Sequence, residues 1–232
     1  MLVIAIDGRS GAGKTSLAAR LRLELGAPVV ALEDLYGGWD GLERGVDLLV
    51  SEVLEPLSAG RAARVPRYDW VAATWGTPWV LEPPGVLIVE GVGAGACRAA
   101  AYESVLAWME LPALVRKKRA LDRDGETFAP HWDAWAAQED AMLARERTWE
   151  RADVVLDGLG PGDSAAARVL ARLPGPRAMI TKDLHRRILR SNGTSAGGAC
   201  SSWLRLLGTP SWCDSAGLVS QAQYRRTSYG QG

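Results

Sequence analysis

Residues 2–15 read LVIAIDGRSGAGKT, an apolar run followed by a glycine-rich turn that ends in lysine and threonine. Residues 8–15 match the pattern G-x-x-x-x-G-K-S/T in full, and residues 16–23 continue at helical spacing. In this pattern the glycines let backbone N–H groups point at a phosphate, the lysine reaches the β- and γ-phosphates, and the hydroxyl can hold Mg²⁺. The stretch therefore predicts a strand, a phosphate-binding loop and a helix that bind ATP or GTP. The residues expected to contact the nucleotide are Gly8, Arg9, Ser10, Gly11, Ala12, Gly13, Lys14, Thr15 and Ser16.

Strand-like and helical stretches alternate along the rest of the chain. Strands are predicted over residues 2–7, 28–32, 85–90, 104–111 and 152–156, and helices over residues 14–25, 45–57, 112–123 and 130–151. Strands that alternate with helices imply a parallel sheet covered on both faces, with ligands at the carboxyl ends of its strands. The predicted fold class is therefore α/β, a three-layer P-loop NTPase fold with a central parallel sheet.

The overall composition is that of an ordinary globular protein, with 47% hydrophobic and 23% charged residues in a chain of 232. No apolar run approaches the about 18 residues that span a bilayer, and no secretory signal precedes the first strand. Three cysteines without CxxC spacing and only two histidines disfavour a disulfide framework or a zinc site. These features predict a cytoplasmic enzyme that does not enter a membrane.

The charge is divided unevenly along the chain. Residues 1–174 contain 19 Lys and Arg against 25 Asp and Glu, whereas residues 175–232 contain 8 against 2. The boundary lies at Leu173–Pro176, a stretch that interrupts regular structure. We predict a catalytic domain over residues 1–174 and a basic, poorly structured extension over residues 175–232, with a short helix over residues 180–190. A basic tail can bind nucleic acid, but an extension without a dedicated role is the favoured interpretation.

Acidic residues follow two of the predicted strands. Glu33 and Asp34 come directly after the second strand, and either is a candidate base that takes a proton from a phosphate acceptor. A solvated acidic loop is the alternative for this pair. Glu90 ends the third strand, where its carboxylate can hold Mg²⁺ beside Thr15.

Basic residues gather on the helix predicted over residues 112–123. Four consecutive charges, Arg116–Arg119, cannot all face one site, so Arg119 and Arg123 are the candidates to clamp a triphosphate and neutralise charge in the transition state. A solvated helix face is the alternative.

Aromatic residues are frequent between the second predicted helix and the third predicted strand. Tyr68 and Asp69 offer hydrogen bonds there to an acceptor, and Trp70, Trp75 and Trp79 offer stacking surfaces. Packing in the core explains the tryptophans equally well, so Tyr68 and Asp69 are the better candidates.

The order of these motifs resembles the uridine kinase-like branch of P-loop kinases, which also includes nicotinamide riboside and phosphoribulose kinases. The D-x-F-Y segment of that family, whose first acid is the catalytic base, corresponds to Glu33–Tyr36. The resemblance therefore implies that Glu33 is the base, with Asp34 as the alternative. It also implies that Asp40 binds the ribose hydroxyls of the acceptor, ahead of a P-x-Y-D-F segment that matches Pro66–Trp70.

Three further segments extend the likeness over about residues 1–158. The E-G segment of the family, whose acid helps to bind Mg²⁺, matches Glu90-Gly91, its arginine lid is similar to Arg119–Asp124, and its closing A-D-V segment matches Ala152–Val154. Nucleoside-specific members carry a histidine shortly after Y-D-F, where this chain has Ala73.

The resemblance implies an ATP-dependent kinase that uses Mg²⁺ and moves the γ-phosphate to a hydroxyl of a nucleoside-like small molecule. A kinase for another sugar, vitamin or nucleotide is an alternative, as is a nucleotide-dependent ATPase or switch without a small acceptor. The sequence leaves open whether the chain forms a homo-oligomer.

Overall fold

The computed structural model describes residues 1–174. The predicted extension over residues 175–232, with its helix over residues 180–190, lies outside the described residues. Among the residues that are described, no helix has both the length and the apolar character that crossing a bilayer requires.

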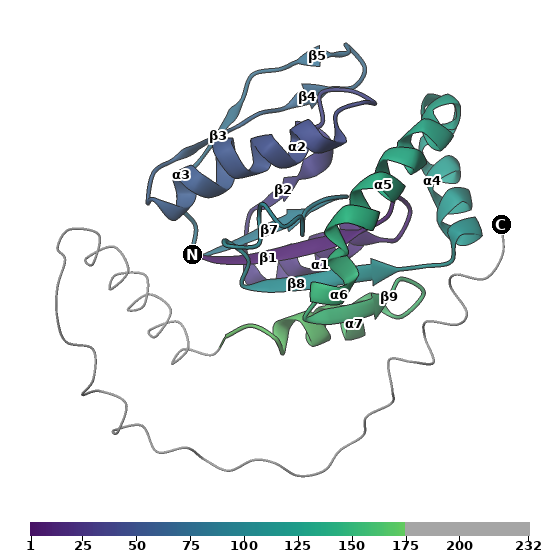
Figure 1. Cartoon of the computed structure of the whole chain (residues 1–232). Helices are drawn as coiled ribbons and strands as arrows, with labels where there is room; N and C mark the ends of the chain where they lie inside the picture. The colour runs from purple at the N-terminus through teal and green to yellow at the C-terminus, as the bar shows by residue number, and fades with distance from the viewer. Residues whose placement is uncertain (175–232) are drawn as a thin grey trace, which may run out of the picture. The chain divides into compact units, whose positions relative to one another are not determined.

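Five parallel strands form the central sheet, in the order β2-β7-β1-β8-β9 (Figure 1). They are β1 (Leu2–Gly8), β2 (Val29–Ala31), β7 (Val86–Glu90), β8 (Val105–Glu110) and β9 (Val154–Asp157). Each coincides with a predicted strand to within two residues at either end. Because all five run in the same direction, their carboxyl ends meet at one edge of the sheet, where the loop after β1 also lies.

One face of the sheet packs against α1 (Lys14–Leu25) and α7 (Gly162–Leu170), which contact each other. Ile4 and Ile6 of β1 share a buried cluster there with Leu17 and Leu21 of α1 and with Val169 of α7. Successive side chains of a strand point to opposite faces, so Val3 lies in the core on the other side of the sheet. The described part of the chain therefore has the predicted three-layer α/β fold.

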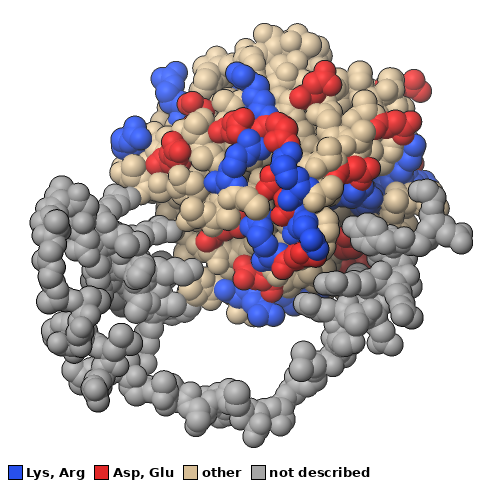
Figure 2. All heavy atoms as spheres, viewed as in Figure 1, with Lys and Arg blue, Asp and Glu red and all other residues tan. Residues whose placement is uncertain are grey.

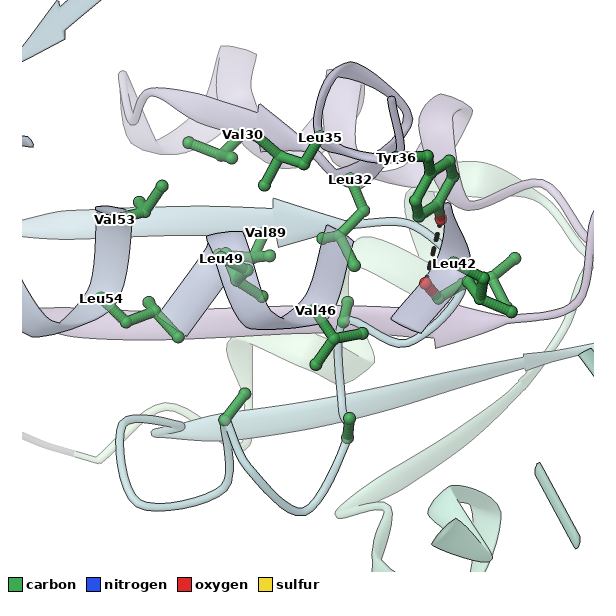
Figure 3. Packing of buried hydrophobic residues seen from close by; sticks show 14 of the residues in the cluster. Val30, Leu32, Leu35, Tyr36, Leu42, Val46, Leu49, Val53, Leu54 and Val89 are labelled. Atoms are coloured by element: carbon green, nitrogen blue, oxygen red, sulfur yellow. Dashed lines mark hydrogen bonds between the residues drawn. The ribbon is translucent and has the colours of Figure 1, made fainter. Parts of the chain in front are cut away.

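The opposite face packs against a nearly continuous helical segment over residues 42–58. It consists of α2 (Leu42–Leu48), a wider π-helical turn η2 (Leu49–Leu54) and α3 (Glu55–Ser58). Val46, Leu49 and Val53 from this segment share a buried cluster with Val89 of β7 (Figure 3). Their apolar spacing is the periodicity that predicts a helix over residues 45–57.

The carboxyl-terminal half of the domain departs from the predicted helices at two breaks. α4 (Ala113–Phe128) is longer than predicted and contains non-helical backbone at Gly125. The helix predicted over residues 130–151 is instead a short 3₁₀ turn η3 (Ala129–His131), then α5 (Trp132–Glu146) and α6 (Thr148–Arg151). The prediction of one helix is wrong because Arg147 adopts left-handed backbone with φ 47°, and its N–H caps α5 on the Leu143 carbonyl.

Two small antiparallel ladders lie between α3 and β7 in the sequence. β3 (Ala63–Val65) pairs with β6 (Trp79–Leu81), and β4 (Tyr68–Asp69) pairs with β5 (Thr74–Trp75). Asp69 Oδ1 closes the β4–β5 turn by accepting the N–H groups of Val71 and Ala72, each at 2.9 Å. Strands of two or three residues are too short to produce a recognisable alternation, so the sequence analysis did not predict them.

Charged side chains of both signs are interspersed on the face of the domain that Figure 2 shows. Several of them form surface ion pairs that join separate elements, such as Arg98 with Glu43 at 2.6 Å and Arg145 with Glu43 at 2.7 Å. Pairs this exposed contribute little to stability, about 0–1 kcal/mol each. The buried apolar clusters on the two faces of the sheet therefore dominate the stability of the fold.

A buried carboxylate, that of Glu103, lies in the segment that leads into β8. Glu103 has a side chain only 10% exposed, and its nearest ion-pair partner is the Arg151 guanidinium at 3.9 Å. Its Oε1 atom is buried without a hydrogen-bond partner among the described residues. Burial raises the pKa of Glu103 to about 7, and Arg151 only partly opposes that effect.

We expect Leu49→Ala to lower the free energy of unfolding by about 2–5 kcal/mol, because it removes a side chain that is 0% exposed and leaves a cavity. Urea denaturation followed by circular dichroism measures this change. Leu114→Ala, at a side chain that is 85% exposed on α4, is the matched control and should stay within about 0.5 kcal/mol of the wild type. Equal effects of the two substitutions would contradict the assigned core.

We also expect Glu103 to make stability depend on pH. Because its pKa of about 7 in the folded chain exceeds the ordinary value of 4.5, its contribution is fully present below pH 4.5 and is lost as pH rises through 7. Relative to Glu103→Gln, which does not titrate, the wild type should lose about 3 kcal/mol of unfolding free energy between pH 4.5 and pH 8. Urea denaturation of both proteins across this pH range tests the prediction. If the unfolding free energies of the two proteins differ by the same amount at every pH, the pKa of Glu103 is the same in the folded and unfolded chains.

Candidate active site

The phosphate-binding loop joins the end of β1 to the start of α1 at the carboxyl edge of the sheet. Gly11 and Gly13 have φ of +79° and +101°, and a Cβ at Gly11 would collide with the Arg116 carbonyl. No side chain caps the amino end of α1, which favours an anion at that end. Lys14 is buried, and its Nζ donates to the Arg9 carbonyl at 3.0 Å. This geometry is that of a loop able to surround a phosphate.

Thr15 and Glu90 meet where the first turn of α1 faces the end of β7. The Thr15 hydroxyl donates to Glu90 Oε1 at 3.1 Å. A hydroxyl and a carboxylate suit Mg²⁺, which takes oxygen ligands and usually binds one or two protein groups together with phosphates and water. Residues 1–174 contain no group of three or more His, Cys, Asp or Glu arranged to hold a metal ion. A Mg²⁺ ion here would therefore depend on nucleotide and water for its remaining ligands.

A pocket opens beside this pair, with an empty volume of about 600 Å³ that includes its open mouth. Its polar wall combines residues of the phosphate-binding loop with three acids and one arginine from other elements: Ser10, Gly11, Lys14, Thr15, Glu33, Glu90, Arg123 and Asp124. Its apolar wall consists of Tyr36, Trp39, Trp70, Val92, Phe128 and Trp135, and Gly91 also lines the pocket. The remaining predicted loop residues do not line it, namely Gly8, Arg9, Ala12, Gly13 and Ser16.

Among the predicted acids, Glu33 lines the pocket and Asp34 does not. Both belong to the 3₁₀ turn η1 (Leu32–Leu35) that follows β2. Burial raises the pKa of Glu33, while the nearby Arg123 guanidinium opposes that shift. Burial also raises the pKa of Asp34, opposed by Arg67.

The two predicted arginines lie in different surroundings. Arg123 lines the pocket and makes a two-pronged hydrogen bond to Asp124, with Nε–Oδ1 and Nη2–Oδ2 distances of 2.7 and 2.6 Å. This hydrogen bond raises the pKa of Arg123. The Arg119 guanidinium instead donates to the Gly158 carbonyl at 3.1 Å, outside the pocket. The pocket thus brings together Lys14, Thr15, Glu33, Glu90 and Arg123.

The three predicted acceptor-binding residues do not line the pocket. Asp40 is exposed, and Asp69 Oδ1 is engaged within the β4–β5 turn. Tyr68 packs edge-on against Trp70 and Trp75, with ring centroids 5.3 Å apart in each pair. Tyr68 therefore supports a residue of the pocket wall and is itself outside it.

Aromatic side chains line the pocket in place of these three predicted residues. Most polar atoms of their rings are engaged within the chain. The Tyr36 hydroxyl donates to the Val92 carbonyl at 2.9 Å, as Figure 3 shows, and Trp70 Nε1 donates to the Glu33 carbonyl at 3.1 Å. The wall therefore offers ring faces and edges to a ligand. The sequence contains these rings, but ten scattered tryptophans carry no signal of which ones converge.

Asp7 was also not among the predicted site residues. It is fully buried at the end of β1 and accepts the N–H groups of Gly8, Gly93 and Gly95 at 2.6, 3.0 and 2.9 Å. Burial raises the pKa of Asp7, and these hydrogen bonds oppose the shift. The carboxylate ties the start of the phosphate-binding loop to the loop that follows Glu90. The available signal was an acid at the end of an otherwise apolar strand.

No protein-family model matches this chain, and no curated protein matches it. Among solved structures, the chain is similar to a possible uridine kinase from Bacillus stearothermophilus, at 23% identity and a TM-score of 0.51. The match covers 67% of this chain and 88% of that one. An uncharacterized protein from Eubacterium ventriosum matches at 12% identity and a TM-score of 0.44, over 74% of this chain and 97% of that one. The first of these likenesses, together with the topology, shows that the described part of the chain shares its three-layer α/β fold with that solved structure.

Proposed function

We propose that this protein is an ATP-dependent kinase that transfers the γ-phosphate of ATP to a hydroxyl of a nucleoside-like small molecule. One observation supports the proposal above the others. Glu33, an exposed residue, lines the same pocket as Lys14 and the Thr15–Glu90 pair, together with a group of aromatic side chains. A transferase needs a phosphate-binding loop and a proton acceptor on opposite sides of one cavity.

The donor half of the pocket would bind the triphosphate. The loop N–H groups and Lys14 would hold the β- and γ-phosphates, and Arg123 would offset the charge that develops during transfer. Thr15 and Glu90 would hold Mg²⁺, which would supply charge neutralisation for the phosphates. Arg123 would have to exchange Asp124 for a phosphate, and the adjacent non-helical backbone at Gly125 gives α4 a place to bend.

Glu33 would act as the base. Its carboxylate would take the proton of the acceptor hydroxyl as the oxygen bonds to the γ-phosphorus and the bond to the β-phosphate oxygen breaks, which releases ADP. A carboxyl with a raised pKa is a stronger base than an ordinary one. Asp34 is the alternative base from the sequence, but it does not line the pocket.

The acceptor would be held mainly by stacking. Trp39 and Trp70 have ring centroids 4.7 Å apart, and Phe128 stacks on Trp39 at 5.3 Å, so the wall is a continuous group of rings. A flat base fits such a wall, because offset and edge-to-face ring pairs are favourable. Ala73, at the histidine position of nucleoside-specific kinases, is exposed in the β4–β5 turn. These features favour recognition of a ring over recognition of the polar edge of a base.

ADP release, measured with Mg-ATP and a panel of nucleosides, ribosides and free sugars, tests the proposed function. We expect turnover that depends on the acceptor and is fastest with ring-bearing ribosides. Lys14→Ala should reduce it at least about 100-fold, because a cation that stabilises the transferred phosphate is lost. Lys118→Ala, at a side chain that is 74% exposed and paired with Asp122, is the control and should retain activity. A rate of ADP release that is the same with and without every acceptor would instead favour an ATPase or switch.

Comparison of Glu33→Gln with Asp34→Asn tests the identity of the base. We expect Glu33→Gln to lower kcat about 10²–10⁴-fold, the usual effect of losing an acid–base group, and Asp34→Asn to lower it less than about tenfold. In the wild type, kcat/KM should rise with pH through a pKa above the ordinary glutamate value of 4.5. The opposite ranking would assign the base to Asp34, and two small effects would exclude both residues.

A further inference from the structure

Ser10 of the phosphate-binding loop is held through all three of its polar groups. Its N–H donates to Glu139 Oε1 at 2.9 Å, its carbonyl accepts from Arg116 at 3.3 Å, and its hydroxyl oxygen accepts from Trp135 Nε1 at 3.0 Å. Glu139 is only 1% exposed, and its Oε1 also accepts from Trp135 Nε1 at 3.0 Å. Bonds to a carboxylate are stronger than neutral ones. Glu139 and Trp135 of α5, together with Arg116 of α4, therefore hold this loop residue in place.

The same helix also holds the aromatic wall. Gln138, the neighbour of Glu139, donates from Nε2 to the Trp39 carbonyl at 2.7 Å. The ring of Trp135 packs against Tyr36 and Trp39, with centroid distances of 4.9 and 6.3 Å. Residues spaced three and four apart share one side of a helix. Trp135, Gln138 and Glu139 thus connect one side of α5 to both walls of the pocket.

We propose that α5 positions the two halves of the pocket separately, through adjacent residues. Glu139 is a positioning residue for the phosphate-binding loop, and Gln138 is a positioning residue for the Trp39 part of the acceptor wall. The Gln138 half of the proposal rests on the proposed function, whereas the Glu139 half needs only nucleotide binding. Neither side chain lines the pocket, so both act through the residues that they hold.

The charge of Glu139 has a second effect on the loop. Burial lowers the pKa of Lys14, and the carboxylates of Glu90 and Glu139 oppose that shift. Glu139→Gln retains an oxygen that can accept from Ser10 but removes this charge, whereas Glu139→Leu removes both. The two substitutions separate the hydrogen bond from the charge.

Titration calorimetry with Mg-ADP on the full chain tests Glu139. We expect Glu139→Leu to weaken Mg-ADP binding about tenfold or more, the usual cost of losing a hydrogen bond to a charged group, and Glu139→Gln to stay within about threefold of the wild type. Asp133→Asn, at a side chain of α5 that is 93% exposed, is the matched control and should not change binding. Unchanged binding in Glu139→Leu would overturn the assignment.

Amide hydrogen exchange at Ser10 provides a measurement that does not depend on how well Glu139→Leu folds. The Ser10 amide should be protected in the ligand-free wild type and should exchange faster in Glu139→Gln, whose neutral oxygen accepts more weakly. An unprotected Ser10 amide in the wild type would show that Glu139 does not hold the loop.

Steady-state kinetics with the best acceptor of the panel test Gln138. Gln138→Met keeps the length of the side chain but removes the donor to Trp39, so we expect the acceptor KM to rise about fivefold or more, while Mg-ADP binding stays within about twofold. Equal changes in both parameters, or none, would overturn separate positioning. If no acceptor is phosphorylated, the proposed function fails and the role of Gln138 fails with it, whereas the Mg-ADP and exchange results still decide the role of Glu139.

Discussion

The carboxylate of Asp7 is the interaction on which the geometry of the pocket depends. It lies in the interior at the end of the central strand and accepts three backbone N–H groups, one from the phosphate-binding loop and two from the segment after β7. Each of these N–H groups would otherwise be buried without a partner, at a cost of about 1–3 kcal/mol. One side chain therefore fixes the two loops that carry Lys14 and Glu90 relative to each other.

Elements that are distant in the sequence supply the rest of the pocket at the carboxyl edge of the sheet. The turn after β2 supplies Glu33, the end of α4 supplies Arg123 and Phe128, and α5 supplies Trp135. Helix α5 contacts both the loop and the aromatic wall, so the distance between the two walls depends on how this helix packs. The parallel sheet makes this convergence possible, because its strands all end at the same edge.

Strong local patterns allowed much of the fold to be predicted. All five strands of the central sheet follow from continuous apolar runs in the sequence, and the helix α1 follows from its helical spacing. The break at Arg147 was not predicted, since left-handed backbone at a non-glycine residue has no sequence signature. Asp40, Tyr68 and Asp69 were chosen from their order along the chain, and the exposed loop and hairpin that carry them lie beside the pocket wall without lining it.

The sequence by itself determined the phosphate-binding loop and the Thr15–Glu90 pair, because these depend on local glycines and on strand ends that a parallel sheet must bring together. It also determined that an acid follows β2. Only the tertiary structure decided which acid enters the pocket, which rings line it, and that Glu139 and Gln138 bond to Ser10 and Trp39. Those outcomes depend on residues 37 to 129 positions apart, whose contacts are set by helix packing and leave no trace in local periodicity.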